Sequence, residues 1–218
     1  MTLVMPARDC PLCPRLATYR ADTARSFPDW HNAPVPSFGS LDARLLVVGL
    51  GPGLRGANRT GRPFTGDYAG DLLYATMIAH GFAHGCYRAP RDDARWHGDA
   101  LSLSDARVTN AVRCVPPANK PLPQEIKTCR RFLAAEIAAM TRLRVVVALG
   151  RVAHEATLAA LALPQRQFPF AHAAAHELGR ALTLFDSFHC SRYNTNTRRL
   201  TPEMFAAVFA AARDRLAR

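Results

Sequence analysis

The strongest constraint on the fold is a repeated pattern in which a short, almost continuous apolar run is followed by a helical segment. The first run, RLLVVGLGPG (Arg44–Gly53), ends in glycines, and RVVVALG (Arg144–Gly150) repeats that ending. Two further segments, ARVTNAV (Ala106–Val112) and ALTLFDSF (Ala181–Phe188), are also predicted to be strands. Apolar runs without alternation are typical of parallel strands that are buried on both faces.

Segments with apolar residues at helical spacing separate and follow these strands. The predicted helices are Asp71–Phe82, Pro121–Met140, Val152–Leu163 and a last helix that Thr201 caps. Alternating strands and helices predict an α/β fold with a parallel sheet covered on both faces. Residues 1–40 show no sustained period, so we expect an irregular lead-in, and Arg88–Asp99 reads as a charged loop.

Four polar or glycine-rich segments follow the predicted strands. They are Gly49–Asp67, Asn110–Cys114, Gly150–His154 and His189–Arg199. In open parallel sheets, ligands bind beyond the carboxyl ends of the strands. We therefore expect the functional site to lie among these four segments.

The segment Gly49–Gly70, GLGPGLRGANRTGRPFTGDYAG, is the most informative of the chain. Six glycines precede one acid, Asp67, and glycine lets backbone come close to a ligand. It has neither the Gly-Lys-Ser/Thr of a phosphate loop nor the dinucleotide-binding spacing. Phe64 could stack on a planar base or be a core residue, and the segment itself could be a long surface loop.

A second polar group follows the last predicted strand, in FHCSRYNTNTRR (Phe188–Arg199). His189, Ser191, Arg192 and Asn194 can bind phosphate, and His189 can act as a donor or an acid. A single histidine is usually structural, but four polar residues at one strand end favour a site.

Six cysteines are present, and four of them suggest a metal centre. Cys10 and Cys13 form C-P-L-C, while Cys114 and Cys129 lie at a strand end and within a helix. Four such ligands could hold zinc or an iron–sulfur cluster, or could be unrelated thiols, and their spacing does not decide among these.

The charge of the chain suits a polyanionic partner such as nucleic acid, although a basic enzyme without such a partner could carry the same charge. The formal net charge is +11, and all but two of the 28 basic residues are arginine, whose planar fork can bond two phosphate oxygens. No apolar stretch is long enough for a membrane helix, and no secretion signal precedes Cys10. We therefore expect a cytoplasmic protein without a membrane partner, and a monomer.

Three motifs together resemble the uracil-DNA glycosylase superfamily. They are the glycine-rich segment with its string NRTGRPFTGD, then VTNAVRC, and then HCSRYNTNTRRLTPEM. Within this superfamily the chain is most similar to family 5, the B type of bacteria and archaea, and the similarity covers nearly the whole chain.

The resemblance implies a three-layer α/β/α sandwich around a four-stranded parallel sheet, in one domain. It also implies a 4Fe–4S iron–sulfur cluster on Cys10, Cys13, Cys114 and Cys129. The implied activity is hydrolysis of the N-glycosidic bond of uracil in DNA, with other deaminated bases such as hypoxanthine and xanthine, as the first step of base-excision repair. The implied partner is DNA that contains such bases.

The resemblance also assigns roles to single residues. Asp67 and His189 are the expected catalytic residues, because Leu50 stands where related families carry an acid and cannot activate water. The base is expected to meet Gly51, Phe64 and Asn110. The DNA backbone is expected to meet Arg59, Ser191, Arg192 and Asn194.

One residue departs from the family pattern, which has Pro or Val where this chain has Cys190 after His189. Either the loop is freer there, or the thiol contacts DNA or the base. The alternative function is a non-catalytic nucleic-acid-binding module with a metal-stapled loop. A phosphohydrolase is disfavoured because Asp67 and Asp71 do not form a metal-binding carboxylate cluster.

Overall fold

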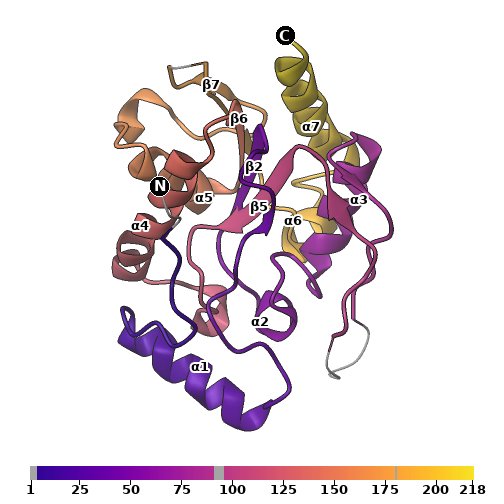
Figure 1. Cartoon of the computed structure of the whole chain (residues 1–218). Helices are drawn as coiled ribbons and strands as arrows, with labels where there is room; N and C mark the ends of the chain where they lie inside the picture. Colours follow the sequence, from indigo (N-terminus) through magenta and orange to yellow (C-terminus); the bar gives the residue numbers. More distant parts are fainter. Residues whose placement is uncertain (1–3, 91–95, 180) are drawn as a thin grey trace.

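The central sheet carries the four predicted parallel strands and an antiparallel strand at each edge. The computed structural model describes residues 4–90, 96–179 and 181–218, and there the strand order is β1-β5-β2-β6-β8-β7 (Figure 1). The parallel strands are β2 (Leu45–Gly49), β5 (Ala106–Asn110), β6 (Val145–Leu149) and β8 (Thr183–Ser187). The edge strands are β1 (Phe38–Gly39) and β7 (Ala175–Glu177). The predicted α/β class is confirmed, with two short strands added to the four.

Helices cover both faces of this sheet, as Figure 1 shows. The longer ones are α1 (Pro14–Ser26), α3 (Tyr68–Ala79), α4 (Pro123–Ala139), α5 (Arg151–Ala160) and α7 (Pro202–Ala217). The short helices are α2 (Ala57–Thr60), α6 (Arg192–Asn196) and the 3₁₀ turns η1 (Pro117–Asn119) and η2 (Gln165–Gln167). Two further short strands, β3 (Ala83–His84) and β4 (Ser102–Leu103), form a separate pair. Residues 91–95 of the predicted charged loop lie outside the described residues.

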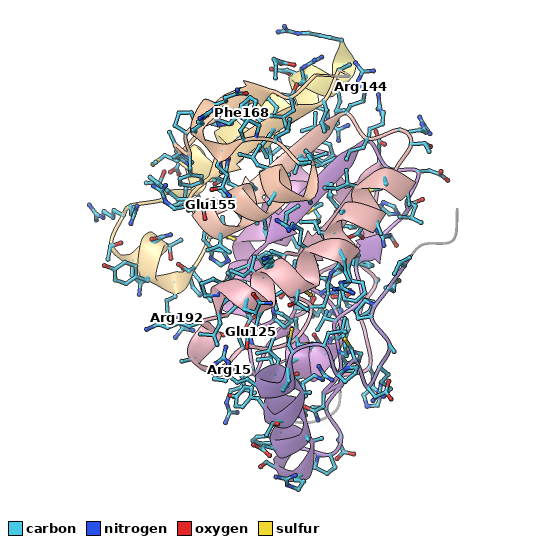
Figure 2. The ribbon with its side chains drawn as sticks, turned by 90° about the vertical axis from the view of Figure 1, so that its left-hand side faces the viewer. Arg15, Glu125, Arg144, Glu155, Phe168 and Arg192 are labelled. Atoms are coloured by element: carbon cyan, nitrogen blue, oxygen red, sulfur yellow. The ribbon has the colours of Figure 1, made fainter. Side chains whose placement is uncertain are left out.

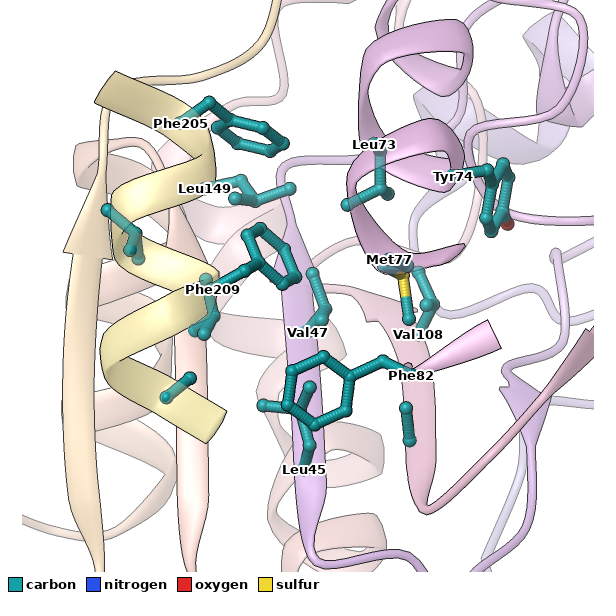
Figure 3. Close-up of a cluster of buried hydrophobic side chains, with 14 of the residues drawn as sticks. Leu45, Val47, Leu73, Tyr74, Met77, Phe82, Val108, Leu149, Phe205 and Phe209 are labelled. Carbon is teal, nitrogen blue, oxygen red and sulfur yellow. The ribbon is translucent and has the colours of Figure 1, made fainter. Parts of the chain in front are cut away.

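Alternate residues of β2 enter two different cores, because successive side chains of a strand point to opposite faces. Leu45 and Val47 pack with α3 and α7, where Figure 3 shows Leu73, Phe205 and Phe209 around them. Leu46 and Val48 pack on the other face, against α4 and α5. The near-continuous apolar run of the sequence is thus explained by burial on both sides.

A buried carboxylate fixes α4 to the neighbouring strand. Glu136 accepts hydrogen bonds from Arg107 at 2.6 Å, from Thr109 at 2.9 Å and from Arg113 at 2.5 Å. Burial alone would raise the pKa of Glu136, but the two guanidinium groups hold it below its usual value. This side of the sheet is therefore held by charge as well as by apolar contact.

The prediction of an irregular lead-in over residues 1–40 is wrong for α1. Pro14 begins this helix, where its missing N–H costs nothing. Leu16 and Arg20 are buried, and Arg20 donates to the carbonyl of Cys10 at 3.0 Å. Only a few buried positions anchor α1, so its apolar period is too weak to recognise in the sequence.

Candidate functional site

A cavity of about 530 Å³ lies where the strand ends of β2, β5 and β8 meet. Most of the predicted site residues line it: Gly51, Phe64, Asp67, Asn110, His189, Ser191 and Arg192. Leu50, Gly53, Tyr68, Ala69 and Asn119 complete the wall. Three of the four expected segments contribute, whereas no residue of Gly150–His154, where α5 begins at Arg151, lines the cavity.

Glycines of the segment Gly49–Asp67 leave space that the protein's own side chains occupy. A Cβ on Gly56 would lie 2.0 Å from Cγ of Asp67, and one on Gly53 would lie 2.4 Å from its Oδ1. The backbone N–H groups of Ala57 and Gly53 donate to the carboxylate. The segment is therefore a carboxylate-holding loop.

The environment of Asp67 makes its carboxyl group a weaker acid than usual. Burial raises its pKa to about 6, while the hydrogen bonds from Ala57 and Gly53 and the charge of Arg59 oppose that rise. A carboxylate with this pKa is ionised at neutral pH and can accept a proton from water. Asp67 therefore has the properties of a general base beside the cavity.

Phe64 forms an aromatic wall of the same cavity. Its backbone is in the left-handed region, with φ of 55°, which a bulky residue seldom adopts. Its ring contacts Gly49, where an added Cβ would lie 2.4 Å from Cζ. The side-chain oxygen of Asn110 lies 2.5 Å from the same Cβ position, so Gly49 allows both side chains to reach the cavity.

His189 faces Phe64, and their ring centroids are 6.1 Å apart. Burial lowers the pKa of the imidazole to about 4, so the ring is neutral at pH 7. A neutral ring still offers one N–H donor. Asn194 donates to the backbone carbonyl of His189 at 2.8 Å and thereby holds this loop.

Two residues of the predicted DNA-contacting set make contacts within the protein. Arg59 is only 6% exposed, donates to the carbonyl of Pro90 at 3.3 Å and lies over the ring of Trp30. It therefore faces Asp67 and its loop rather than the surface, which corrects its expected position. Asn194 is turned toward the His189 carbonyl, although it remains partly exposed.

Ser191 and Arg192 do lie at the mouth of the cavity. Ser191 caps α6 and accepts from the backbone N–H of Asn194. Arg192 lies over the ring of Tyr68, 5.3 Å from its centroid, and projects from the ribbon in Figure 2. Thr195 donates to the hydroxyl of Tyr68 at 3.2 Å, so α6 and the start of α3 meet at the mouth.

The sequence reasoning missed Tyr68 and Asn119 as cavity residues. Tyr68 is 41% exposed. In the sequence, the signal that could have found it is an aromatic residue directly after Asp67. Asn119 follows β5 by nine positions, on a turn where Ala118 and Asn119 both have positive φ. Pro116 and Pro117 indicate a turn in the sequence, but they do not show that Asn119 reaches the cavity.

Cys190 points away from the cavity. It is fully buried in the apolar core, and its thiol lies 3.5 Å from the carbonyl of Ala69. This placement excludes the expected alternative in which the thiol contacts DNA or a base.

The four predicted ligand cysteines line one small buried cavity. Its wall consists of Cys10, Cys13, Cys114 and Cys129 with Leu16, Phe132 and other residues. Arg20 donates to Sγ of Cys114 at 2.7 Å, and the N–H of Arg113 donates to Sγ of Cys129 at 3.3 Å. The fold thus brings the N-terminal pair, Cys10 and Cys13, close to Cys114 and Cys129, which lie about a hundred residues further along the chain.

Comparison with known proteins identifies the family. A family model described as the uracil DNA glycosylase superfamily matches residues 36–213. The chain belongs to this superfamily. A Type-5 uracil-DNA glycosylase of Thermus thermophilus is 44% identical to it over 94% of this chain and 92% of that protein. Type-5 uracil-DNA glycosylases of Mycobacterium bovis and Pyrobaculum aerophilum are 39% and 36% identical over 94% of this chain, covering 77% and 88% of those proteins.

Membership in the superfamily agrees with the position of the cavity at the carboxyl ends of the strands. None of the described helices is both long and apolar enough to cross a membrane.

Proposed function

We propose that this member of the superfamily hydrolyses the N-glycosidic bond of uracil in DNA, and also releases deaminated purines such as hypoxanthine and xanthine. The observation that carries the proposal is a carboxylate with a raised pKa that shares a cavity with an aromatic wall and a neutral histidine. The similarity to Type-5 uracil-DNA glycosylases supports the choice of uracil.

The substrate base must leave the duplex to reach this cavity, at a cost of a few kcal/mol. In the proposed complex, Phe64 stacks on the base, Asn110 bonds its edge and the backbone at Gly51 lies against it. Ser191 and Arg192 bind phosphates at the cavity mouth. The chain has a formal net charge of +11, which favours that contact.

The reaction places charge on both sides of the breaking bond. As the C1′–N bond breaks, its electron pair moves onto the base, and the sugar becomes cationic. His189 donates an N–H to the base oxygen where negative charge develops. Asp67 stabilises the cationic sugar and accepts a proton from the water that attacks C1′.

The abasic site is the expected product, without strand cleavage. Schiff-base chemistry needs an amine, and the two lysines of the chain, Lys120 and Lys127, are absent from the wall of the cavity.

We propose that Cys10, Cys13, Cys114 and Cys129, which line one small cavity, hold an iron–sulfur cluster. Zinc bonds of about 2.3 Å would bring four thiolates to about 3.8 Å from one another. Among the described residues, no three of these sulfur atoms lie within 4.8 Å of one another. The wider spacing favours a larger group, and in this place the cluster fastens the N-terminal segment to the body of the protein.

The deciding experiment is an assay of base release. Duplex oligonucleotides with one uracil, hypoxanthine or xanthine are incubated with the protein and then treated with alkali, which cleaves abasic sites. We expect cleavage at uracil with alkali and an intact strand without it. Binding of the oligonucleotides without any alkali-sensitive product would instead support the nucleic-acid-binding module. Cleavage at uracil alone would restrict the proposal to that base.

A further inference from the structure

A second group of ligand-type side chains lies outside the cavity, at the far side of β8. Asp186 of β8, His154 of α5 and His176 of β7 each offer one ligand atom, and these atoms all lie within 4.8 Å of one another. Asp186 is fully buried and shares the sheet face of Leu184, toward α5. These residues line neither the cavity that contains Asp67 and His189 nor the cavity of the four cysteines.

Two of the distances between ligand atoms are close to those around a divalent metal ion. Nδ1 of His154 is 2.7 Å from Oδ1 of Asp186, and Nε2 of His176 is 3.0 Å from Oδ2. Bonds of about 2.0–2.1 Å in tetrahedral geometry place ligand atoms about 3.3 Å apart. These two pairs would therefore lengthen by only a few tenths of an ångström around an ion, and the ligand atoms of all three residues already lie within 4.8 Å of one another.

The hydrogen-bond partners of His154 also favour a positive charge at this ring. Nε2 of His154 lies 2.9 Å from the carbonyl of Phe168, so both ring nitrogens face acceptors. A neutral imidazole has only one N–H and can satisfy one of them. A metal ion on Nδ1 resolves this, because Nε2–H then donates to the carbonyl, the arrangement that metal-bound histidines commonly have.

A surface cavity reaches one member of the group, His154. A surface cavity of about 220 Å³ is lined by His154, Glu155 and Phe168, among others. Phe168 and Glu155 are labelled on the same side of the molecule in Figure 2. The rings of Phe168 and Phe170 pack against His176 and His154 and shield the group from bulk water.

We propose that His154, His176 and Asp186 bind a zinc-type divalent cation, with one coordination position left for water. Two imidazoles and one carboxylate are ligands that suit zinc, whereas magnesium and calcium prefer oxygen ligands alone. The ion joins β7, β8 and α5, and its ligand Asp186 precedes His189 by three residues. Its role is to brace the strand that carries the histidine of the cavity. This inference is independent of the proposed glycosylase activity.

The test measures zinc binding directly. Protein carrying its cysteine-bound group is dialysed against EDTA, freed of chelator and titrated with ZnCl₂ in competition with a chromophoric chelator. We expect one zinc ion per chain and a higher melting temperature. His176→Gln keeps an amide donor to Asp186 but should weaken zinc binding by more than about 100-fold, since even supporting residues of metal sites are worth 10–100-fold.

The matched control is His84→Gln, which removes an exposed histidine of β3 and should bind zinc like the wild type. The proposal is overturned if wild-type protein binds no zinc at micromolar concentration, which would leave a purely proton-linked network. It is equally overturned if His176→Gln binds zinc with unchanged affinity, which would place the ion elsewhere, for example at cysteines. Base release is not a readout here, so either proposal can fail alone.

Discussion

At the scale of single residues, Asp67 and His189 have complementary acid–base properties in one cavity. Burial acts on both, yet it shifts them in opposite directions, because in each case it disfavours the charged form. The pKa of Asp67 rises to about 6, and that of His189 falls to about 4. At pH 7 the cavity therefore contains one carboxylate that can accept a proton and one neutral ring that can donate a hydrogen bond.

The substitution Asp67→Asn tests the chemical role of the carboxylate. We expect the single-turnover rate on uracil-containing DNA to fall by about 10²–10⁴-fold, which is the range for a general base, while DNA affinity changes only a few-fold. The control is Asp71→Asn, one turn along α3, where the side chain is exposed. Equal losses of rate and affinity would remove Asp67 from the chemistry.

Asp67→Asn should not weaken the fold. The folded-state pKa of Asp67 lies above its ordinary value, so the folded protein binds this proton more tightly than the unfolded chain does. Stability is therefore lost as the pH rises from about 4 to 6, the full cost of ionisation is present at pH 7, and a neutral amide removes that cost. A denaturant titration at pH 7 should show a free energy of unfolding at or above that of the wild type.

The rate should depend on pH through the same carboxyl group. Below a pH of about 6 the protonated fraction of Asp67 grows, so the single-turnover rate should fall roughly tenfold per pH unit and level off above pH 7. His189 stays neutral over this range and contributes no second limb. The profile measured from pH 5 to 8 should lose its acidic limb in Asp67→Asn, and a flat wild-type profile would contradict the assignment.

At the scale of elements, the loop between β2 and α3 uses its glycines to accommodate side chains of the protein itself. Gly53 and Gly56 leave room for the Asp67 carboxylate, and Gly49 leaves room for Phe64 and Asn110. Across the cavity, α6 holds the His189 loop through Asn194 and touches Tyr68. The geometry of the site thus depends on two loops that are fixed separately.

Gly56→Ala tests the role of that close approach. The new Cβ would lie 2.0 Å from Cγ of Asp67, so the carboxylate must move, and we expect the single-turnover rate to fall nearly as far as in Asp67→Asn. Gly98→Ala is the control for replacing a loop glycine: nothing lies within 4 Å of the added Cβ, and because Gly98 has φ of 93° the alanine strains the backbone there without displacing a side chain, so this variant should keep its rate. A Gly56→Ala protein with the wild-type rate would show that the carboxylate tolerates a different position.

At the scale of the whole molecule, the four cysteines connect the N-terminal segment to the end of β5 and to α4. Cys10 and Cys13 precede or begin α1, whereas Cys114 and Cys129 come from the body of the protein. A group bound by all four closes more than a hundred residues of chain. Metal binding of this kind contributes directly to folding.

Cys13→Ala should therefore lose the cluster and loosen α1. We expect about four irons per chain in the wild type and a small fraction of that in the variant, with a lower melting temperature and faster proteolysis near α1. Cys86→Ala, which changes an exposed cysteine, should retain iron and stability. Zinc instead of iron in the purified wild type, or full iron in Cys13→Ala, would refute the cluster assignment.

The sequence by itself determined the strands, the sheet type and most of the residues that line the cavity. Apolar runs such as Leu45–Gly49 are readable because burial on both faces demands them, and the string around Asp67 is distinctive enough to indicate the family. The edge strands β1 and β7 were missed, since two or three residues of pairing leave no period in the sequence, and α1 was missed because only a few of its positions are buried.

Only the tertiary structure decided which side chains the glycines accommodate, where Arg59 and Cys190 point, and that His154, His176 and Asp186 meet. These facts depend on contacts between segments far apart in the chain, such as α5 with β8. Local sequence fixes the conformation of each segment, but the desolvation that sets the pKa of Asp67 and His189 exists only after those segments have packed together.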